Sequence, residues 1–169
     1  GAAHAEAVAL TAAGEHARGA TVYVTLEPCS HKGRTPPCVD QLIAAGVGAV
    51  VIGARDPDVR VDGRGIAALN EAGIAVNVLP GDELESVDPG YFHHRRTGRP
   101  RVVLKTAATI DGQVAAADGT SQWITSPEAR ADAHRLRAAA DAVLIGAGTL
   151  RTDDPELTVR PAPEGDRQP

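Results

Sequence analysis

Residues 21–52 read TVYVTLEPCSHKGRTPPCVDQLIAAGVGAVVI, and this stretch alone indicates an α/β fold. Residues 21–26 are rich in β-branched and aromatic side chains, as is typical of a buried strand. Residues 38–45 predict a helix that ends at Gly46, and residues 47–52 predict a second strand. Because a helix connects the two strands, we expect them to run parallel in one sheet.

The same alternation extends outward from this stretch. On the N-terminal side, the spacing of alanine and valine predicts a helix from residue 5 to about Gly14. On the C-terminal side, residues 66–72 predict a helix stopped by Gly73, and residues 74–79 predict a third strand. The connecting segments are rich in Pro, Gly and charged residues and predict loops at residues 28–37 and 55–65.

A change of composition at residues 80–98, from acidic residues to the pattern YFHHRRTG, predicts a linker or a connecting helix. We therefore divide the chain into a first domain at 1–80, a linker at 81–98 and a second domain at 99–169. In the second domain we expect strands at 102–105 and 142–145 and a short extended segment at 123–125. We expect a helix from Pro127 to about Ala140 with Ser126 as N-cap. Turns are predicted at Asp111-Gly112 and Gly146-Ala147-Gly148, and a frayed tail is predicted at 161–169.

Composition excludes several classes of protein. The chain has 169 residues, of which 43% are hydrophobic and 23% are charged, values that exclude a disordered tail. No apolar run approaches the roughly 18 residues that a membrane span needs, so we expect no membrane partner. The net charge of −5 argues against general nucleic-acid binding. Two cysteines are too few for a disulfide scaffold, and their neighbours indicate metal chemistry instead.

The candidate metal ligands are His4, Cys29 and Cys38. One imidazole and two thiolates suit Zn²⁺, and a site with three protein ligands keeps a fourth position for water, as in catalytic zinc sites. Glu6, two residues after His4, can then lie beside the metal as a proton shuttle. Each feature alone is common on an exposed helix face or in a core, but the joint pattern is rare. Cys38 opens a helix, so we expect the helix dipole to stabilise its thiolate.

The combination of H-A-E at residues 4–6 with P-C and a second Cys resembles the signature of zinc-dependent nucleobase deaminases. The long spacer in PCSHKGRTPPC, residues 28–38, resembles the deaminase domain of the bifunctional riboflavin biosynthesis family, which joins a pyrimidine deaminase to a reductase. The resemblance implies that His4, Cys29 and Cys38 hold zinc and that Glu6 is the proton donor. It also implies contacts of the inserted loop with the ribosyl phosphate of the substrate, through His31, Lys32 and Arg34.

Residues 101–160 are similar to the reductase domain of the same family, which has a dihydrofolate-reductase-like fold and uses NADPH. The similarity rests on LKTAATIDG at 104–112, SQWIT at 121–125 and GAGTLRTDDPELTVR at 146–160. By motif position, the implied NADP contacts are Ala107, Trp123, Thr149 and Asp153, and the implied substrate contacts are Ser121, Arg137, Leu157 and Arg160.

The residues of this second part also allow simpler interpretations. Gly146-Ala147-Gly148 lacks the third glycine of a dinucleotide fingerprint, because Arg151 stands there. Trp123 is either a core residue or a wall against a flat ring. Arg137 and Arg160 either grip a phosphate or pair with one of the nearby carboxylates of Asp132, Asp141 and Asp153.

The predicted fold class is therefore α/β, with a cytidine-deaminase-like three-layer domain followed by the start of a dihydrofolate-reductase-like domain. The resemblance implies zinc-dependent deamination of 2,5-diamino-6-(5-phosphoribosylamino)pyrimidin-4(3H)-one, then NADPH-dependent reduction of its ribosyl group to ribityl, in the bacterial cytoplasm. The sequence also indicates an internal fragment of such an enzyme, and it leaves homo-oligomerisation open. Two alternatives stay open: a stand-alone zinc deaminase of another base, and a non-catalytic zinc-binding module in which His31 is the fourth ligand.

Overall fold

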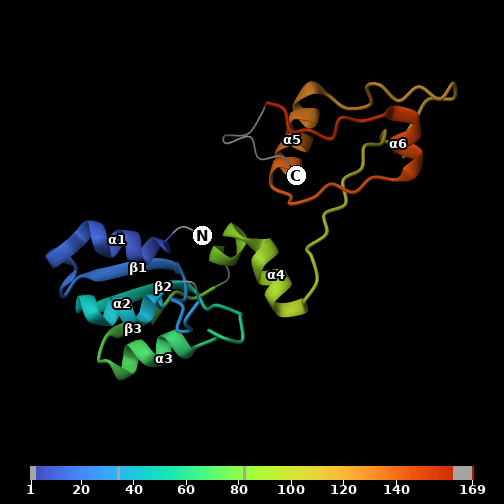
Figure 1. Ribbon diagram of the computed structural model, residues 1–169. Helices are drawn as coiled ribbons and strands as arrows, with labels where there is room; N and C mark the ends of the chain where they lie inside the picture. Colours follow the sequence, from blue (N-terminus) through green and yellow to red (C-terminus); the bar gives the residue numbers. More distant parts are fainter. Residues whose placement is uncertain (1–2, 34, 82, 162–168) are drawn as a thin grey trace. The chain divides into compact units, whose positions relative to one another are not determined.

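The chain was analysed as a computed structural model that describes residues 3–33, 35–81, 83–161 and 169. The chain divides into two compact units, Gly1–Val102 and Val103–Pro169 (Figure 1). The predicted linker at residues 81–98 thus packs as part of the first unit. Within the described residues, no helix has both the length and the apolar character needed to cross a membrane.

The first unit is built on a three-stranded parallel sheet, which confirms the predicted parallel arrangement. Its strands are β1 (Thr21–Leu26), β2 (Ala49–Ala54) and β3 (Ala75–Val78), in the order β1-β2-β3. Strand β2 begins and ends two residues later than the predicted 47–52. At Gly48 a Cβ would lie 2.7 Å from the carbonyl oxygen of Gly19, in the turn before β1. Ladder pairing starts one residue later, where Ala49 pairs with Thr21.

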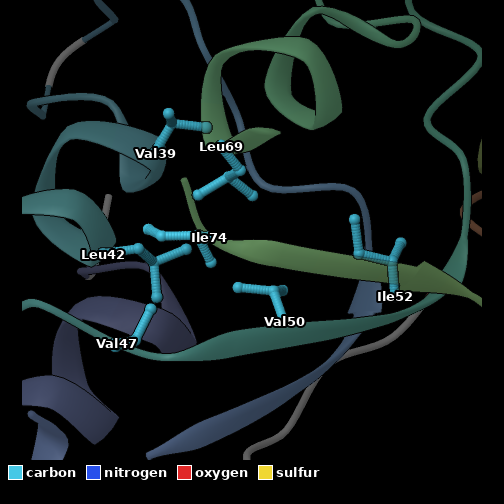
Figure 2. Packing of buried hydrophobic residues seen from close by; sticks show 7 residues of the cluster. All are labelled: Val39, Leu42, Val47, Val50, Ile52, Leu69 and Ile74. Carbon is cyan, nitrogen blue, oxygen red and sulfur yellow. The ribbon is translucent and has the colours of Figure 1, made fainter. Parts of the chain in front are cut away.

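Helices and the sheet enclose one hydrophobic core. The helices are α1 (Ala5–Ala13), the 3-10 helix η1 (Gly14–Ala17), α2 (Cys38–Ala45) and α3 (Arg64–Glu71). Val50 and Ile52 of β2 pack with Leu42 of α2 and Leu69 of α3, and all four are fully buried (Figure 2). Leu10 of α1 packs against the same cluster. Helices α1 and α2 also contact each other, so the core fixes the two helices that carry the candidate metal ligands.

The opposite face of the sheet is only partly covered. Tyr23 of β1 is 77% exposed on this face. The 3-10 helix η2 (Glu83–Val87) covers the sheet at Gly53, where a Cβ would lie 2.1 Å from Cδ1 of Leu84. The same Cβ would lie 2.7 Å from the backbone carbonyl oxygen of Thr25 in β1, so a larger residue at position 53 would force both the Leu84 side chain and the sheet to shift.

Helix α4 (Pro89–Thr97) confirms that the segment before residue 99 includes a connecting helix. Its N-cap is Asp88, whose side chain accepts a hydrogen bond from the backbone N–H of Tyr91. Phe92 is buried, and the Tyr91 hydroxyl donates to the carboxylate of Asp56 at 2.8 Å. These contacts bind α4 to the loop that follows β2.

The second unit contains helices α5 (Pro127–Ala138) and α6 (Ala147–Asp153). The predicted N-cap of α5 is confirmed, because Oγ of Ser126 accepts the backbone N–H of Ala129 at 3.2 Å. The predicted turn at Asp111-Gly112 is also confirmed: the Gly112 N–H donates to the Thr109 carbonyl, and Gly112 has a positive φ of 82°.

The predicted strands of the second unit are wrong. Residues 103–161 are all described and form no strand, and 123–125 lies in a turn. A strand needs a backbone partner, and Leu144, in the predicted strand 142–145, is 98% exposed instead of packing in a sheet. Residues 146–148 enter α6 rather than turning the chain, with Gly146 as N-cap. Within the predicted tail at 161–169, residues 162–168 lie outside the described residues.

Candidate metal centre

Three side chains from separate segments converge beside α1 and α2. His4 is the N-cap of α1, Cys29 lies in the loop after β1, and Cys38 is the first residue of α2. One ligand atom from each lies within 4.8 Å of the other two. Nδ1 of His4 is 3.2 Å from Sγ of Cys38 and 3.7 Å from Sγ of Cys29. The fold therefore brings together the three residues that the sequence predicted as metal ligands.

The backbone at His4 explains how His4 and Glu6 approach the same site. Residues two apart within a helix point in different directions. His4, however, has extended backbone angles (φ −65°, ψ 153°), whereas Glu6 belongs to the first turn of α1. The His4 ring contacts the Cys38 thiol, and the negative charge of Glu6 lies near enough to raise the pKa of that thiol.

The loop carrying Cys29 is tied to the start of α2 by two backbone N–H groups. The N–H of Cys38 donates to Sγ of Cys29 at 3.3 Å, and the N–H of Val39 donates to the Cys29 carbonyl at 3.2 Å. These are among the N–H groups at a helix start that lack partners within the helix. Together they hold the sulfur and the carbonyl group of Cys29 in place at the start of α2.

The electrostatics of Cys38 differ from the sequence prediction. Burial raises the pKa of the Cys38 thiol, and the negative charge of Glu6 raises it further. The sequence analysis considered only the helix dipole, which acts in the opposite direction by favouring the thiolate. A cation is the natural counter-charge for two sulfurs and a carboxylate gathered this closely.

The donor set fits zinc, which prefers nitrogen and sulfur ligands in tetrahedral geometry. Of the described residues, only His4, Cys29 and Cys38 form such a cluster, and His31 is not in it. His31 is half-buried, and its Nδ1 is a buried atom without a hydrogen-bond partner among the described residues. Lys32 is exposed, and Arg34 lies outside the described residues.

Three buried carboxylates of the first unit were not singled out by the sequence analysis. Glu27, Asp56 and Asp58 are all nearly inaccessible to solvent. Hydrogen bonds from the Arg60 side chain hold the pKa of Asp58 well below its usual range. Their positions in the sequence could have indicated them. Glu27 directly follows β1 and Asp56 lies two residues after the end of β2, and the loops at the carboxyl ends of neighbouring parallel strands lie close together.

In the second unit, three of the predicted substrate contacts, Arg137, Leu157 and Arg160, lie where α5 meets the segment after α6. Nη1 of Arg137 donates to the carbonyl of Thr158 at 2.5 Å, next to Leu157. The Arg160 side chain pairs with Glu156, and its backbone N–H donates to His134 of α5. Asp132, one of the carboxylates considered as a partner for the two arginines, pairs with Arg135 instead.

The predicted cofactor contacts lie in several separate segments of the second unit. The Trp123 ring is 69% exposed, and the guanidinium of Arg130 stacks over it at 4.3 Å. Trp123 is therefore not a core residue. Thr149 and Asp153 lie on α6, and Ala107 and Ser121 lie in irregular segments. Among the described residues, no side-chain hydrogen bond joins these cofactor residues to one another.

A parallel sheet, a histidine and a cysteine at two adjoining helix starts, a second cysteine in the loop after β1 and a carboxylate near them define a zinc-type nucleobase deaminase domain. Residues 1–54 match the family described as the cytidine and deoxycytidylate deaminase zinc-binding region. Residues 100–169 match the RibD C-terminal domain. The chain thus combines the cytidine-deaminase-like part and the dihydrofolate-reductase-like part that the sequence predicted.

Similarity continues across both parts. The riboflavin biosynthesis protein RibD of Escherichia coli is 54% identical over 158 residues, which cover 93% of this chain and 43% of that protein. RibD of Mycobacterium tuberculosis H37Rv is 52% identical over 161 residues, or 93% of this chain and 47% of that protein. The chain belongs to the RibD family, and it spans somewhat less than half the length of these relatives.

Solved structures agree with this assignment. Form 1 of Acinetobacter baumannii RibD matches with a TM-score of 0.87 and 46% identity, over 94% of this chain and 45% of that chain. A Thermotoga maritima protein described as a diaminohydroxyphosphoribosylaminopyrimidine deaminase/5-amino-6-(5-phosphoribosylamino)uracil reductase matches with a TM-score of 0.90 and 41% identity, over 100% of this chain and 48% of that chain.

Proposed function

We propose that the chain carries the zinc-binding core of a pyrimidine deaminase and the first part of an NADPH-dependent reductase in riboflavin biosynthesis. The observation that carries this proposal is the placement of His4, Cys29 and Cys38 within 4.8 Å of one another, with the Glu6 carboxylate beside Cys38. In this assignment the deaminase is residues 1–80, the connection is 81–98 and the reductase part is 99–169. The family resemblance supports a cytoplasmic location.

Each residue of the candidate metal centre has a separate task in deamination. Zinc held by His4, Cys29 and Cys38 would lower the pKa of a water to about 7 and so supply the nucleophile. The Glu6 carboxylate takes a proton from the attacking water and gives it to a ring nitrogen of the pyrimidine. A further proton transfer through Glu6 lets the exocyclic amine leave as ammonia, while a carbon–oxygen bond replaces the carbon–nitrogen bond.

The substrate we propose is 2,5-diamino-6-(5-phosphoribosylamino)pyrimidin-4(3H)-one. His31 supports this assignment, because its buried Nδ1 has no partner among the described residues and is available to a ligand. Lys32, which is exposed, and Arg34 follow in the same loop and would supply positive charge for the phosphate.

For the reductase part, we propose that NADPH contacts Ala107, Trp123, Thr149 and Asp153, and that the substrate contacts Ser121, Arg137, Leu157 and Arg160. The exposed ring of Trp123 offers a flat face for a cofactor ring. Arg137 uses one of its five N–H groups on the Thr158 carbonyl, which leaves others for a phosphate. Unchanged substrate affinity in both Arg137→Gln and Arg160→Gln would refute the role of the two arginines.

Glu6→Gln tests the deaminase proposal. The variant should keep one equivalent of zinc and lose ammonia release by about 100-fold or more, the usual contribution of a general acid–base group. Glu15→Gln, on the exposed helix η1, is the matched control and should keep both properties. A Glu6→Gln protein that is loaded with zinc and fully active would refute the role of Glu6, and a wild-type chain that binds no zinc would refute the proposal.

A further inference from the structure

Glu27 is a buried carboxylate with an unusual number of backbone partners. It is 3% exposed. Its Oε2 accepts the backbone N–H groups of Asp56 at 3.4 Å and Gly63 at 3.0 Å. Its Oε1 accepts those of Gly65 at 2.9 Å and Ile66 at 3.2 Å. One side chain thus organises both ends of the loop after β2 and the first turn of α3.

The loop that Glu27 organises also touches the backbone next to Cys29. A Cβ added at Gly65 would lie 2.3 Å from the carbonyl oxygen of Pro28, so α3 begins in direct contact with the residue before Cys29. The backbone N–H of Glu27 donates to the carbonyl of Ala54 at 2.9 Å, which extends the sheet to this point. Residue 27 is therefore bonded to β2, and residue 28 packs against the start of α3.

Cys29 is held from the other side by α2, through the N–H groups of Cys38 and Val39. The segment 27–29 is thus fixed between the starts of two helices, with the Glu27 carboxylate on one side and the Cys29 sulfur and carbonyl on the other. Residue 28 is a proline and has no backbone N–H, so it donates no hydrogen bond within this segment.

We infer that Glu27 is a positioning residue for the metal centre: its carboxylate holds the start of α3 against Pro28 and so keeps Cys29 within reach of His4 and Cys38. This inference rests on the proposed function, because it takes these three residues as zinc ligands. Glu27 itself does not touch the metal, the substrate or the reacting atoms.

Glu27→Gln is the sharpest variant because it keeps the size of the side chain. A glutamine has one acceptor oxygen, so its NH2 group would face either the pair Asp56 and Gly63 or the pair Gly65 and Ile66, donor against donor. We expect the zinc dissociation constant, measured by competition with a chelator, to rise about 10–100-fold, as for other residues that support metal ligands. Glu15→Gln should bind zinc as the wild type does.

The absorption bands of the cobalt-substituted protein provide a readout that a loss of stability alone would not change. The bands of Glu27→Gln should shift, because the angle at which Cys29 approaches the metal changes. Gly65→Ala should also shift them, because its Cβ would lie 2.3 Å from the Pro28 carbonyl oxygen and 3.2 Å from Oε1 of Glu27, and so would push α3 away from both while the carboxylate itself is kept. A folded Glu27→Gln protein with wild-type zinc affinity and cobalt bands would overturn the inference.

Amide hydrogen exchange of the wild-type chain gives a test that needs no variant. Coupling between two sites is reciprocal, so zinc that binds Cys29 should slow exchange at the N–H groups of Gly63, Gly65 and Ile66. Exchange at Ala129, in the second unit, should not change. Zinc binding without an effect on the three amides overturns the inference and leaves the proposed function intact, whereas a wild-type chain that binds no zinc overturns both.

Discussion

Tyr91→Phe tests whether α4 is an integral part of the deaminase unit. The Tyr91 hydroxyl donates to Oδ1 of Asp56 at 2.8 Å, and the only other donor to that oxygen among the described contacts is the N–H of Asp58. Phenylalanine keeps the ring, which packs edge-on against Phe92 and lies under the Arg95 guanidinium. The substitution therefore removes one hydrogen bond to a buried carboxylate, worth about 1.5–3 kcal/mol.

The pH dependence of this effect has a definite sign. Burial and the hydrogen bond to Asp56 raise the pKa of Tyr91 to about 12, from about 10 in an unfolded chain. Between these values the unfolded chain releases the proton and the folded chain keeps it, so the contribution of Tyr91 is complete below about pH 10 and is lost as pH rises toward 12.

Urea unfolding followed by circular dichroism measures both effects. At pH 7 the free energy of unfolding of Tyr91→Phe should be about 1.5–3 kcal/mol below that of the wild type, and the difference should shrink between about pH 10 and 12. Tyr23→Phe, at an exposed position on the sheet, is the control and should change neither. Equal stabilities at pH 7, or a difference that stays constant to pH 12, would refute the assignment of α4 to this unit.

Two further substitutions test the core and the loop after β2. Leu42→Ala, at a fully buried position, should lower the free energy of unfolding, measured with urea, by about 2–5 kcal/mol. Ile43→Ala, on the more exposed side of α2, is the control and should lower it much less. A similar loss in both variants would contradict the packing shown in Figure 2. Asp58→Asn should lower the melting temperature at pH 7, and the difference from the wild type should shrink as pH falls below about 4. Arg60 holds the pKa of Asp58 below its usual range, so the wild type loses the stability that the ionised carboxylate contributes when acid protonates it. A difference in melting temperature that does not change with pH would contradict this role of Asp58.

Local signals in the sequence predicted the first unit well. Helix α2 has the predicted bounds because Pro37 precedes it and Gly46, with a left-handed φ of 67°, ends it. The candidate metal ligands His4, Cys29 and Cys38 could also be predicted, although they are far apart in the chain, because each residue type has a chemical reason to bind zinc and the combination is rare. The helix start at Ser126 was equally local, since serine caps it and proline follows.

The errors and omissions concern interactions between distant residues. Residues 142–145 have the composition of a strand, but no residue pattern specifies which segment would pair with them, and Leu144 is exposed in the structure. The role of Glu27 was hidden for the same reason, because its partners Gly63 and Gly65 lie 36 and 38 residues away. The pKa of Cys38 could not be predicted from its helix position, since burial and Glu6 dominate it.

In the proposed metal centre, one nitrogen and two sulfurs of the protein bind zinc and leave a position for water. X-ray absorption at the zinc edge, on the wild type and on His31→Ala, tests it most directly. We predict one zinc per chain, with two sulfur neighbours at about 2.3 Å and two lighter neighbours at about 2.0 Å, and the same spectrum for His31→Ala. A first coordination shell without two sulfurs, or one that loses an imidazole when His31 is removed, would contradict the account.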